Sequence, residues 1–93
     1  MNSVEIACVG AGYWGKNLVR VFRDLPDVHL RQVCDADPAI RNAIQRQFPE
    51  VATGSDYDLL LQDEALDAVV LAVPAVHHYE LALQALERGK HVY

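Results

Sequence analysis

Short apolar runs alternate along this chain with segments in which apolar residues recur at helical spacing. Continuous apolar runs bounded by turn residues are typical of strands that are covered on both faces of a sheet. They predict strands at 4–9, 28–34, 68–73 and 91–93, and a weaker strand at 50–53.

The segments between these runs predict four helices. The first helix follows the first strand and ends at Pro26 and Asp27. The second begins with Asp37 as its N-cap and Pro38 at its first position. Both helices are therefore delimited by residues whose backbone chemistry suits a helix boundary.

The two remaining helices are predicted in the second half of the chain. Ser55 and Asp58 resemble a capping box for a short helix through Leu61. The last helix covers 77–88, with Gly89 as its C′ residue. We expect one face of this last helix to carry its apolar residues, Tyr79, Ala82, Leu83 and Leu86.

Strands that alternate with helices and short turns predict an α/β fold with a parallel sheet and right-handed crossovers. We expect one domain over 1–93 with strand order 3-2-1-4-5. Because the last residues fall inside the fifth predicted strand, we expect a domain that is truncated in strand 5 and therefore partial.

The turn after the first strand has the form G-x-G-x-x-G. Gly10 allows the tight turn, Gly12 lets the backbone approach a pyrophosphate, and Gly15 lets the next helix pack closely on the strand. Asp35 follows Gly15 by 20 residues, at the end of the second predicted strand. Strand, glycine turn, helix and acid together predict the dinucleotide site of a Rossmann-type, doubly wound sheet.

Asp35 indicates which dinucleotide binds. A carboxylate there accepts hydrogen bonds from the adenosine ribose and repels a 2′-phosphate. NADP binding usually needs an arginine directly after the acid, where this chain has Ala36 and Asp37. Asp35 could instead cap the next helix, but Asp37 suits that role better, so the sequence favours NAD.

Two aromatic residues, Tyr13 and Trp14, fill the variable positions of the glycine turn. Their backbone N–H groups can bind phosphate, and we include both among the candidate cofactor-binding residues. Their side chains can either pack on the protein or stack on the cofactor.

Further candidates follow the fourth strand, beside the switch point at which open α/β sheets bind ligands. Val73, Pro74 and His78 are placed near the centre of a bound cofactor. On position alone, His78 could equally lie solvated in the first helical turn, and for His77 we favour that solvated alternative. Lys90 follows a helix end and suits a helix-dipole partner better than a catalytic lysine.

Composition and charge narrow the functional classes. The net charge of −5 argues against a nucleic-acid partner, and no apolar run is long enough to span a membrane. Cys8 and Cys34 lie in strand patterns, which suggests buried, reduced thiols of a cytoplasmic protein. Neither a metal-ligand spacing nor a nucleophile–base pair is present, so we predict no catalytic or metal site in this chain.

Four segments resemble the Gfo/Idh/MocA oxidoreductases in order and spacing. They are the segments 10–17, 33–35, 72–79 and 85–92. The form Tyr-Trp-Gly-Lys-Asn at 13–17 is most similar to members that act on nucleotide-linked sugars, including UDP-N-acetyl-amino-sugar 3-dehydrogenases.

The resemblance implies an NAD-dependent parent enzyme that transfers hydride between a sugar carbon and nicotinamide. In the family, a C-terminal domain binds the sugar or UDP-sugar and forms the oligomer, and a Glu-Lys-Pro motif after G-K-H-V assists proton transfer. Since this chain ends before that motif, the resemblance implies an inactive cofactor domain and a homo-oligomeric parent. His78 matches a family histidine near the nicotinamide ribose, whereas Ala75 departs from the frequent asparagine.

Two other classes share the glycine turn and the acid. A regulatory NAD-sensing module would lack the Pro-Ala-x-x-His and Gly-Lys-His-Val segments that are present here. A methyltransferase also holds a ribose with an acid after its second strand, but its glycine loop usually lacks the third-glycine spacing.

Overall fold

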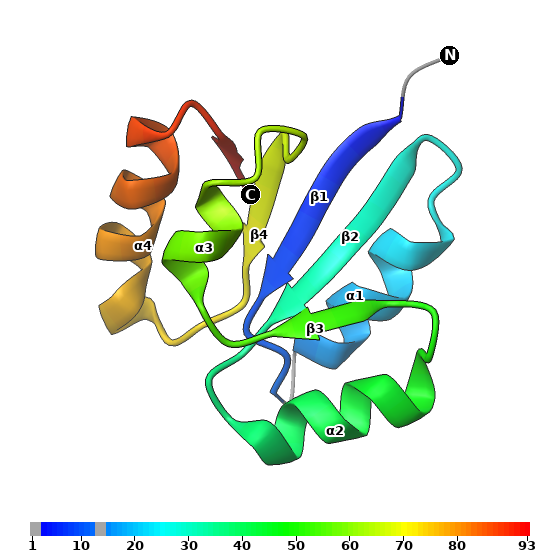
Figure 1. Ribbon diagram of the computed structural model, residues 1–93. Coiled ribbons are helices and arrows are strands. Elements are labelled where there is room, and N and C mark those ends of the chain that lie inside the picture. The colour runs from blue at the N-terminus through cyan, green and yellow to red at the C-terminus, as the bar shows by residue number, and fades with distance from the viewer. Residues whose placement is uncertain (1–2, 13–14) are drawn as a thin grey trace.

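The computed structural model describes residues 3–12 and 15–93. One sheet of five strands runs through the molecule, with helices on both of its faces (Figure 1). The strands are β1 Val4–Val9, β2 Val28–Cys34, β3 Ala52–Gly54, β4 Ala68–Leu71 and β5 His91–Val92. The helices are α1 Gly15–Asp24, α2 Pro38–Gln47, α3 Tyr57–Leu61 and α4 Ala75–Glu87.

Every strand pairing in the sheet is parallel, and the strand order is β3-β2-β1-β4-β5. The predicted Rossmann-type α/β fold and its strand order are therefore confirmed. This order reverses direction at β1, so the carboxyl ends of β1 and β4 flank the switch point at which such sheets bind ligands.

The side chains of β1 alternate between two cores because successive residues of a strand face opposite sides. Ile6 and Cys8 lie in a core completed by α1 and α2. Ala7 and Val9 lie in a second core, completed by α3 and α4. The continuous apolar run of β1 is thus explained by burial on both faces.

The caps of α2 and α3 are both aspartates. Asp37 accepts the Ala39 N–H at 2.9 Å and Pro38 occupies the first position of α2, as predicted. The predicted cap of α3 was wrong by one residue, because Asp56, not Ser55, accepts the Leu59 N–H at 3.1 Å. The backbone of Asp56 is extended, and its carboxylate reaches the exposed N–H groups of the first turn.

Helix α4 packs on the sheet with a face that includes Ala82, as expected, but not Tyr79, Leu83 or Leu86. Ala85 is buried and Leu81 and Ala82 pack beside it, whereas Tyr79 is 79 % exposed. The physical reason is position, since α4 lies against β4 and the short β5 at one side of the sheet (Figure 1). The sheet there covers only a narrow stripe, which leaves four apolar side chains exposed: Val76, Tyr79, Leu83 and Leu86.

Gly89 closes α4 with φ +76°, in agreement with the predicted C′ role. In the described part of the chain, no helix has the length and apolar character needed to cross a membrane.

Candidate functional site

The turn after β1 can be built only with glycine at its first position. Gly10 has φ +88°, a conformation that residues with a side chain rarely adopt. A Cβ atom on Gly10 would also lie 2.6 Å from the carbonyl oxygen of Ala72. The turn therefore presses directly against the chain that leaves β4.

The other two glycines of the motif differ in what their missing side chains allow. A Cβ atom on Gly15 would lie 2.4 Å from the Gly10 carbonyl oxygen, so α1 starts in close contact with the turn. A Cβ atom on Gly12 would meet no atom of residues 3–12 and 15–93 within 4 Å. The fold itself thus does not demand glycine at position 12, whereas close approach of a ligand to the backbone would. Tyr13 and Trp14 lie outside the described residues.

Asp35 stands at the end of β2 and binds the glycine turn itself. Its Oδ2 accepts the Ala11 N–H at 2.9 Å, and its Oδ1 accepts the Asp37 N–H at 2.9 Å. Each carboxylate oxygen keeps a further acceptor position. The carboxylate is thereby fixed in orientation and can still accept the two hydroxyls of a ribose.

A cleft of about 400 Å³ lies at the carboxyl edge of the sheet. It runs from Gly10 and Gly12 past Asp35 to the segment after β3. Most of its remaining lining is apolar or small: Val9, Cys34, Ala36, Ile40, Ser55, Tyr57, Ala72, Val73, Pro74 and Leu81. An apolar cleft with one oriented carboxylate suits a nucleoside, whose base is flat and whose ribose carries the polar groups.

A second cleft of about 490 Å³ adjoins the first, and Gly12, Val73 and Pro74 line both. His78 and Leu18 complete its lining together with residues of the β4 end. The predicted residues Val73, Pro74 and His78 are thus brought together beside the glycine turn.

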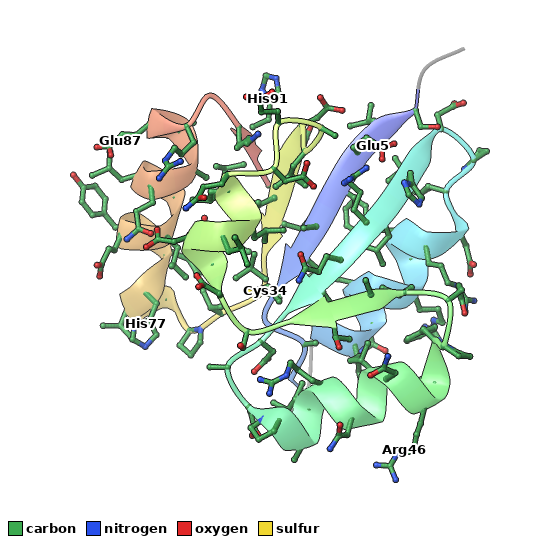
Figure 2. All side chains as sticks on the ribbon, viewed as in Figure 1. Glu5, Cys34, Arg46, His77, Glu87 and His91 are labelled. Carbon is green, nitrogen blue, oxygen red and sulfur yellow. The ribbon has the colours of Figure 1, made fainter. Side chains whose placement is uncertain are left out.

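His77 lies away from both clefts. It is exposed at the start of α4, and its side chain points away from the sheet (Figure 2). Its N–H donates to the Pro74 carbonyl at 2.9 Å, as in an ordinary first helical turn.

Sequence reasoning missed Ser55 and Tyr57, which line the first cleft from the segment after β3. The Tyr57 hydroxyl donates to the Leu81 carbonyl at 2.7 Å and so ties α3 to α4. Burial raises the pKa of Tyr57 to about 12, so the hydroxyl stays protonated and donates at neutral pH. The available signal was position, because β3 ends at the same edge of the parallel sheet as β2.

Both cysteines are free and buried, as predicted. Burial raises the pKa of Cys8 to about 12 and that of Cys34 to about 11. Cys34 lines the first cleft, yet its thiol is protonated at neutral pH and is a poor nucleophile there.

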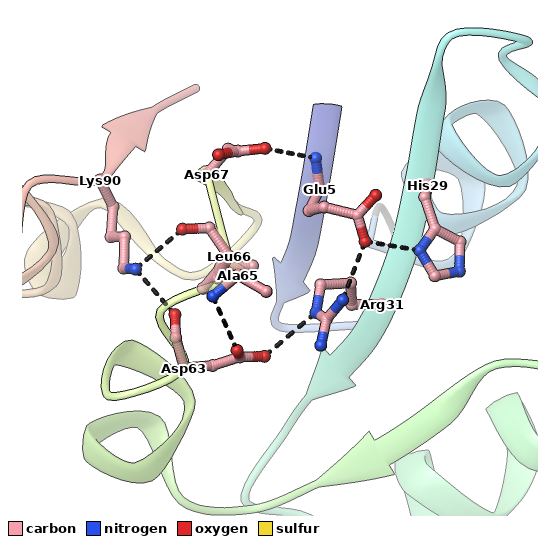
Figure 3. Close-up of polar contacts among 8 residues, drawn as sticks. All are labelled: Glu5, His29, Arg31, Asp63, Ala65, Leu66, Asp67 and Lys90. Atoms are coloured by element: carbon pink, nitrogen blue, oxygen red, sulfur yellow. Dashed lines mark hydrogen bonds and ion pairs between the residues drawn. The ribbon is translucent and has the colours of Figure 1, made fainter. Parts of the chain in front are cut away.

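The opposite edge of the sheet carries a polar network (Figure 3). Lys90 is only 8 % exposed, and its Nζ donates to the carbonyls of Asp63 and Leu66, both at 2.8 Å. Both carbonyls belong to the loop between α3 and β4, so Lys90 holds this loop and does not act as the predicted dipole partner at a helix end. Figure 2 shows Glu5 at this edge of the sheet and Cys34 at the opposite, carboxyl edge.

The glycine turn, the open side of Gly12 and the oriented Asp35 carboxylate fit a dinucleotide. Residues 4–93 match the model of an oxidoreductase family described by its NAD-binding Rossmann fold. The chain belongs to this Gfo/Idh/MocA family. The family model is described as NAD-binding, in agreement with the prediction of NAD as the cofactor. The methyltransferase alternative is thereby set aside.

Curated relatives of this Gfo/Idh/MocA chain include glycosyl hydrolase family 109 proteins. One from Shewanella baltica (strain OS195) is 33 % identical over 103 residues, which cover 100 % of this chain and 22 % of the relative. A Shewanella oneidensis relative named alpha-N-acetylgalactosaminidase is 30 % identical over 102 residues, again 100 % of this chain and 22 % of the relative.

Solved structures of similar fold include two with a bound cofactor. GenD2 from gentamicin A biosynthesis, in complex with NAD, has TM-score 0.90 and 29 % identity over 99 % of this chain and 26 % of its own. Scyllo-inositol dehydrogenase from Lactobacillus casei, with NAD(H) and scyllo-inositol, has TM-score 0.84 and 25 % identity over 98 % of this chain and 27 % of its own. This Gfo/Idh/MocA chain therefore spans about a quarter or less of the relatives it matches.

Proposed function

We propose that residues 1–93 are the cofactor domain of an NAD-dependent oxidoreductase that transfers hydride between nicotinamide and a hydroxyl-bearing ring carbon. The observation that carries this proposal is the Asp35 carboxylate, which is held by Ala11 at the mouth of the apolar cleft. The substrate would be a sugar, including a nucleotide-linked sugar, or a similar polyol. Support for this class comes from the scyllo-inositol dehydrogenase neighbour and its bound polyol.

Each candidate residue has a role along the length of the cofactor. The backbone around Gly12 would receive the pyrophosphate, with Gly10 and Gly15 shaping the turn. Asp35 would bind the adenosine ribose, and the first cleft would hold the adenine. Val73, Pro74 and His78 line the second cleft, where the nicotinamide half would lie. The bound dinucleotide supplies the hydride acceptor or donor, while these residues bind and orient it.

The chain alone should not catalyse this reaction. Oxidation of an alcohol releases a proton, which a positioned side chain has to accept. Lys90 is buried at the other edge of the sheet and engaged with two carbonyls. The proton acceptor and the sugar contacts would therefore come from a substrate domain outside this chain.

A second candidate is a glycosidase, which the relatives named glycosyl hydrolase family 109 and alpha-N-acetylgalactosaminidase favour. NAD-dependent glycosidases exist outside this family as an exception to the usual carboxylate pair. The two candidates differ in the net consumption of NAD. A dehydrogenase converts NAD to NADH, which accumulates, whereas a glycosidase releases an alcohol and leaves the amount of NAD unchanged.

We further propose self-association and a cytoplasmic location. β5 is an edge strand of the described sheet and packs beside α4. The exposed apolar residues of α4 lie beside it and would be covered by a second copy. The two free, buried cysteines suit a reducing compartment.

Two assays test the proposed function. The 93-residue chain is incubated with NAD and with scyllo-inositol, UDP-N-acetylglucosamine or an aryl α-N-acetylgalactosaminide, and NADH and released aryl alcohol are followed. The chain should give neither product. The longer protein that carries this domain should give NADH with a ring alcohol; aryl alcohol without NADH would favour the glycosidase, and turnover by the chain alone would contradict the proposed division of roles.

A further inference from the structure

A second charged side chain lies beside Asp35, six residues later in the sequence. Arg41 is in the first turns of α2, and its Nη1 donates to the main-chain carbonyl of Asp35 at 2.8 Å. The side chain is partly buried there, so its guanidinium group is held at the carboxyl end of β2. It thus occupies the same end of the site as the Asp35 carboxylate.

The charge of Arg41 is not neutralised within the described residues. Among residues 3–12 and 15–93, no carboxylate lies within ion-pair distance of Arg41, although Asp35 and Asp37 are close in sequence. Their carboxylates accept main-chain N–H groups instead, those of Ala11, Asp37 and Ala39. A guanidinium group has five N–H donors, and the Asp35 carbonyl is its one hydrogen-bond acceptor within residues 3–12 and 15–93.

The charge of Arg41 also acts on Cys34, a residue that lines the cleft. Burial, followed by the negative charges of Asp35 and Asp56, raises the pKa of Cys34, and the positive charge of Arg41 acts in the opposite direction. Cys34 lines the first cleft, as does Ile40, the residue before Arg41. Arg41 does not itself line the cleft, but its guanidinium group lies 2.8 Å from the main-chain carbonyl of Asp35, a residue that does.

We propose that Arg41 is a cofactor-specificity residue that faces the 2′ position of the adenosine ribose. This inference rests on the cofactor site described above. A guanidinium group is suited to bidentate binding of phosphate. The site would then carry both the acid that rejects a 2′-phosphate and the cation that would hold one, and Asp35 alone would keep the site selective for NAD.

This arrangement differs from the expectation drawn from the residues next to Asp35. Ala36 and Asp37 supply no cation, yet Arg41 reaches the same place from one helical turn further on. A single substitution at Asp35 should consequently change the cofactor preference, with no second change needed to introduce a positive charge.

The experiment compares NADH and NADPH binding by the wild-type chain and by Asp35→Ser, Asp35→Ser/Arg41→Met and Asp35→Ser/Arg46→Met. Arg46 is the matched control, because it is on the same helix and its side chain extends from the outer end of α2 (Figure 2). Circular dichroism verifies folding, and Asp35→Asn replaces Asp35→Ser in all variants should the serine background not fold.

We expect Asp35→Ser to bind NADPH about tenfold or more tightly than the wild type, the gain typical of a charge-assisted phosphate contact. Arg41→Met should abolish that gain, Arg46→Met should keep it, and added salt should reduce it. Equal NADPH binding with and without Arg41 would overturn the inference while leaving the NAD site intact. A folded wild-type chain that binds neither dinucleotide would contradict the cofactor site as well.

Discussion

The Asp35 carboxylate lies 2.9 Å from the main-chain nitrogen of Ala11, across 24 residues of sequence. The acid expected to bind the ribose is therefore also a structural partner of the glycine turn. Ligand contact and loop position depend on the same carboxylate, so a change at Asp35 should affect both the fold and the cofactor.

Asp35→Ala should lower the free energy of unfolding by about 1–3 kcal/mol, because the N–H groups of Ala11 and Asp37 lose a charged acceptor. It should also weaken NADH binding. Asp56→Ala is the control, since it removes only the cap of α3 and should cost about 1 kcal/mol without weakening NADH binding. Urea unfolding and NADH titration measure both effects, and unchanged NADH affinity in Asp35→Ala would contradict the assigned role.

The glycines of the turn should separate folding from binding. Gly10→Ala should destabilise the fold by more than about 1 kcal/mol, since it combines a positive φ with a 2.6 Å approach to the Ala72 carbonyl. Gly12→Ala has open space among the described residues and should leave the unfolding free energy nearly unchanged while weakening NADH binding.

Gly89→Ala controls for the backbone effect alone, because Gly89 also has positive φ but its added Cβ would meet nothing within 4 Å. Thermal unfolding should rank Gly10→Ala below Gly89→Ala. A Gly12→Ala variant that binds NADH normally would argue against a pyrophosphate at this turn.

Lys90→Met should destabilise the chain by about 2–4 kcal/mol, because two carbonyls that now share one ammonium group would lose their donor. Methionine retains most of the apolar stem, so the loss reports mainly on the two hydrogen bonds. Arg46→Met, which removes an exposed cation, should change the unfolding free energy by less than about 0.5 kcal/mol. Equal urea midpoints for the two variants would refute this account of Lys90.

Glu5 should contribute to acid sensitivity. Hydrogen bonds from His29 and from Arg31 hold the pKa of Glu5 below its ordinary value of 4.5. A carboxyl group whose pKa is lowered by folding stabilises the fold above its unfolded-state pKa, and this stability is lost as the pH falls through the folded-state pKa.

Glu5→Gln should therefore be less stable than the wild type at neutral pH, and the difference should shrink as the pH is lowered below 4.5. Urea midpoints measured across this range test the prediction, with exposed Glu64→Gln as the control. A difference that stays constant down to acid pH would show that the ionisation of Glu5 is not responsible.

The sheet and the glycine turn could be predicted because both depend on local sequence. The apolar run of β1 favours a strand that is buried on both faces. The pair Asp37 and Pro38 favours the start of a helix. The choice between Ser55 and Asp56 as cap could not be predicted in the same way, because both residue types cap helices and only the path of the backbone after β3 separates them.

Contacts that depend on tertiary packing also could not be predicted from the sequence. The buried face of α4 is set by the width of sheet left beside β4, so Leu81 packs inward while Leu86 stays exposed. Likewise, the Arg41 side chain turns back to the Asp35 carbonyl, and no spacing rule in the sequence indicates that direction.

The central claim, that this chain forms an NAD site at the carboxyl edge of its sheet, is tested most directly by titration with NADH. Trp14 is the only tryptophan and belongs to the glycine-turn sequence, so its fluorescence provides the signal. We predict saturable quenching with one NADH per chain, energy transfer to the nicotinamide and much weaker binding of NADPH. A chain that is folded by circular dichroism but shows no saturable NADH binding would contradict the account.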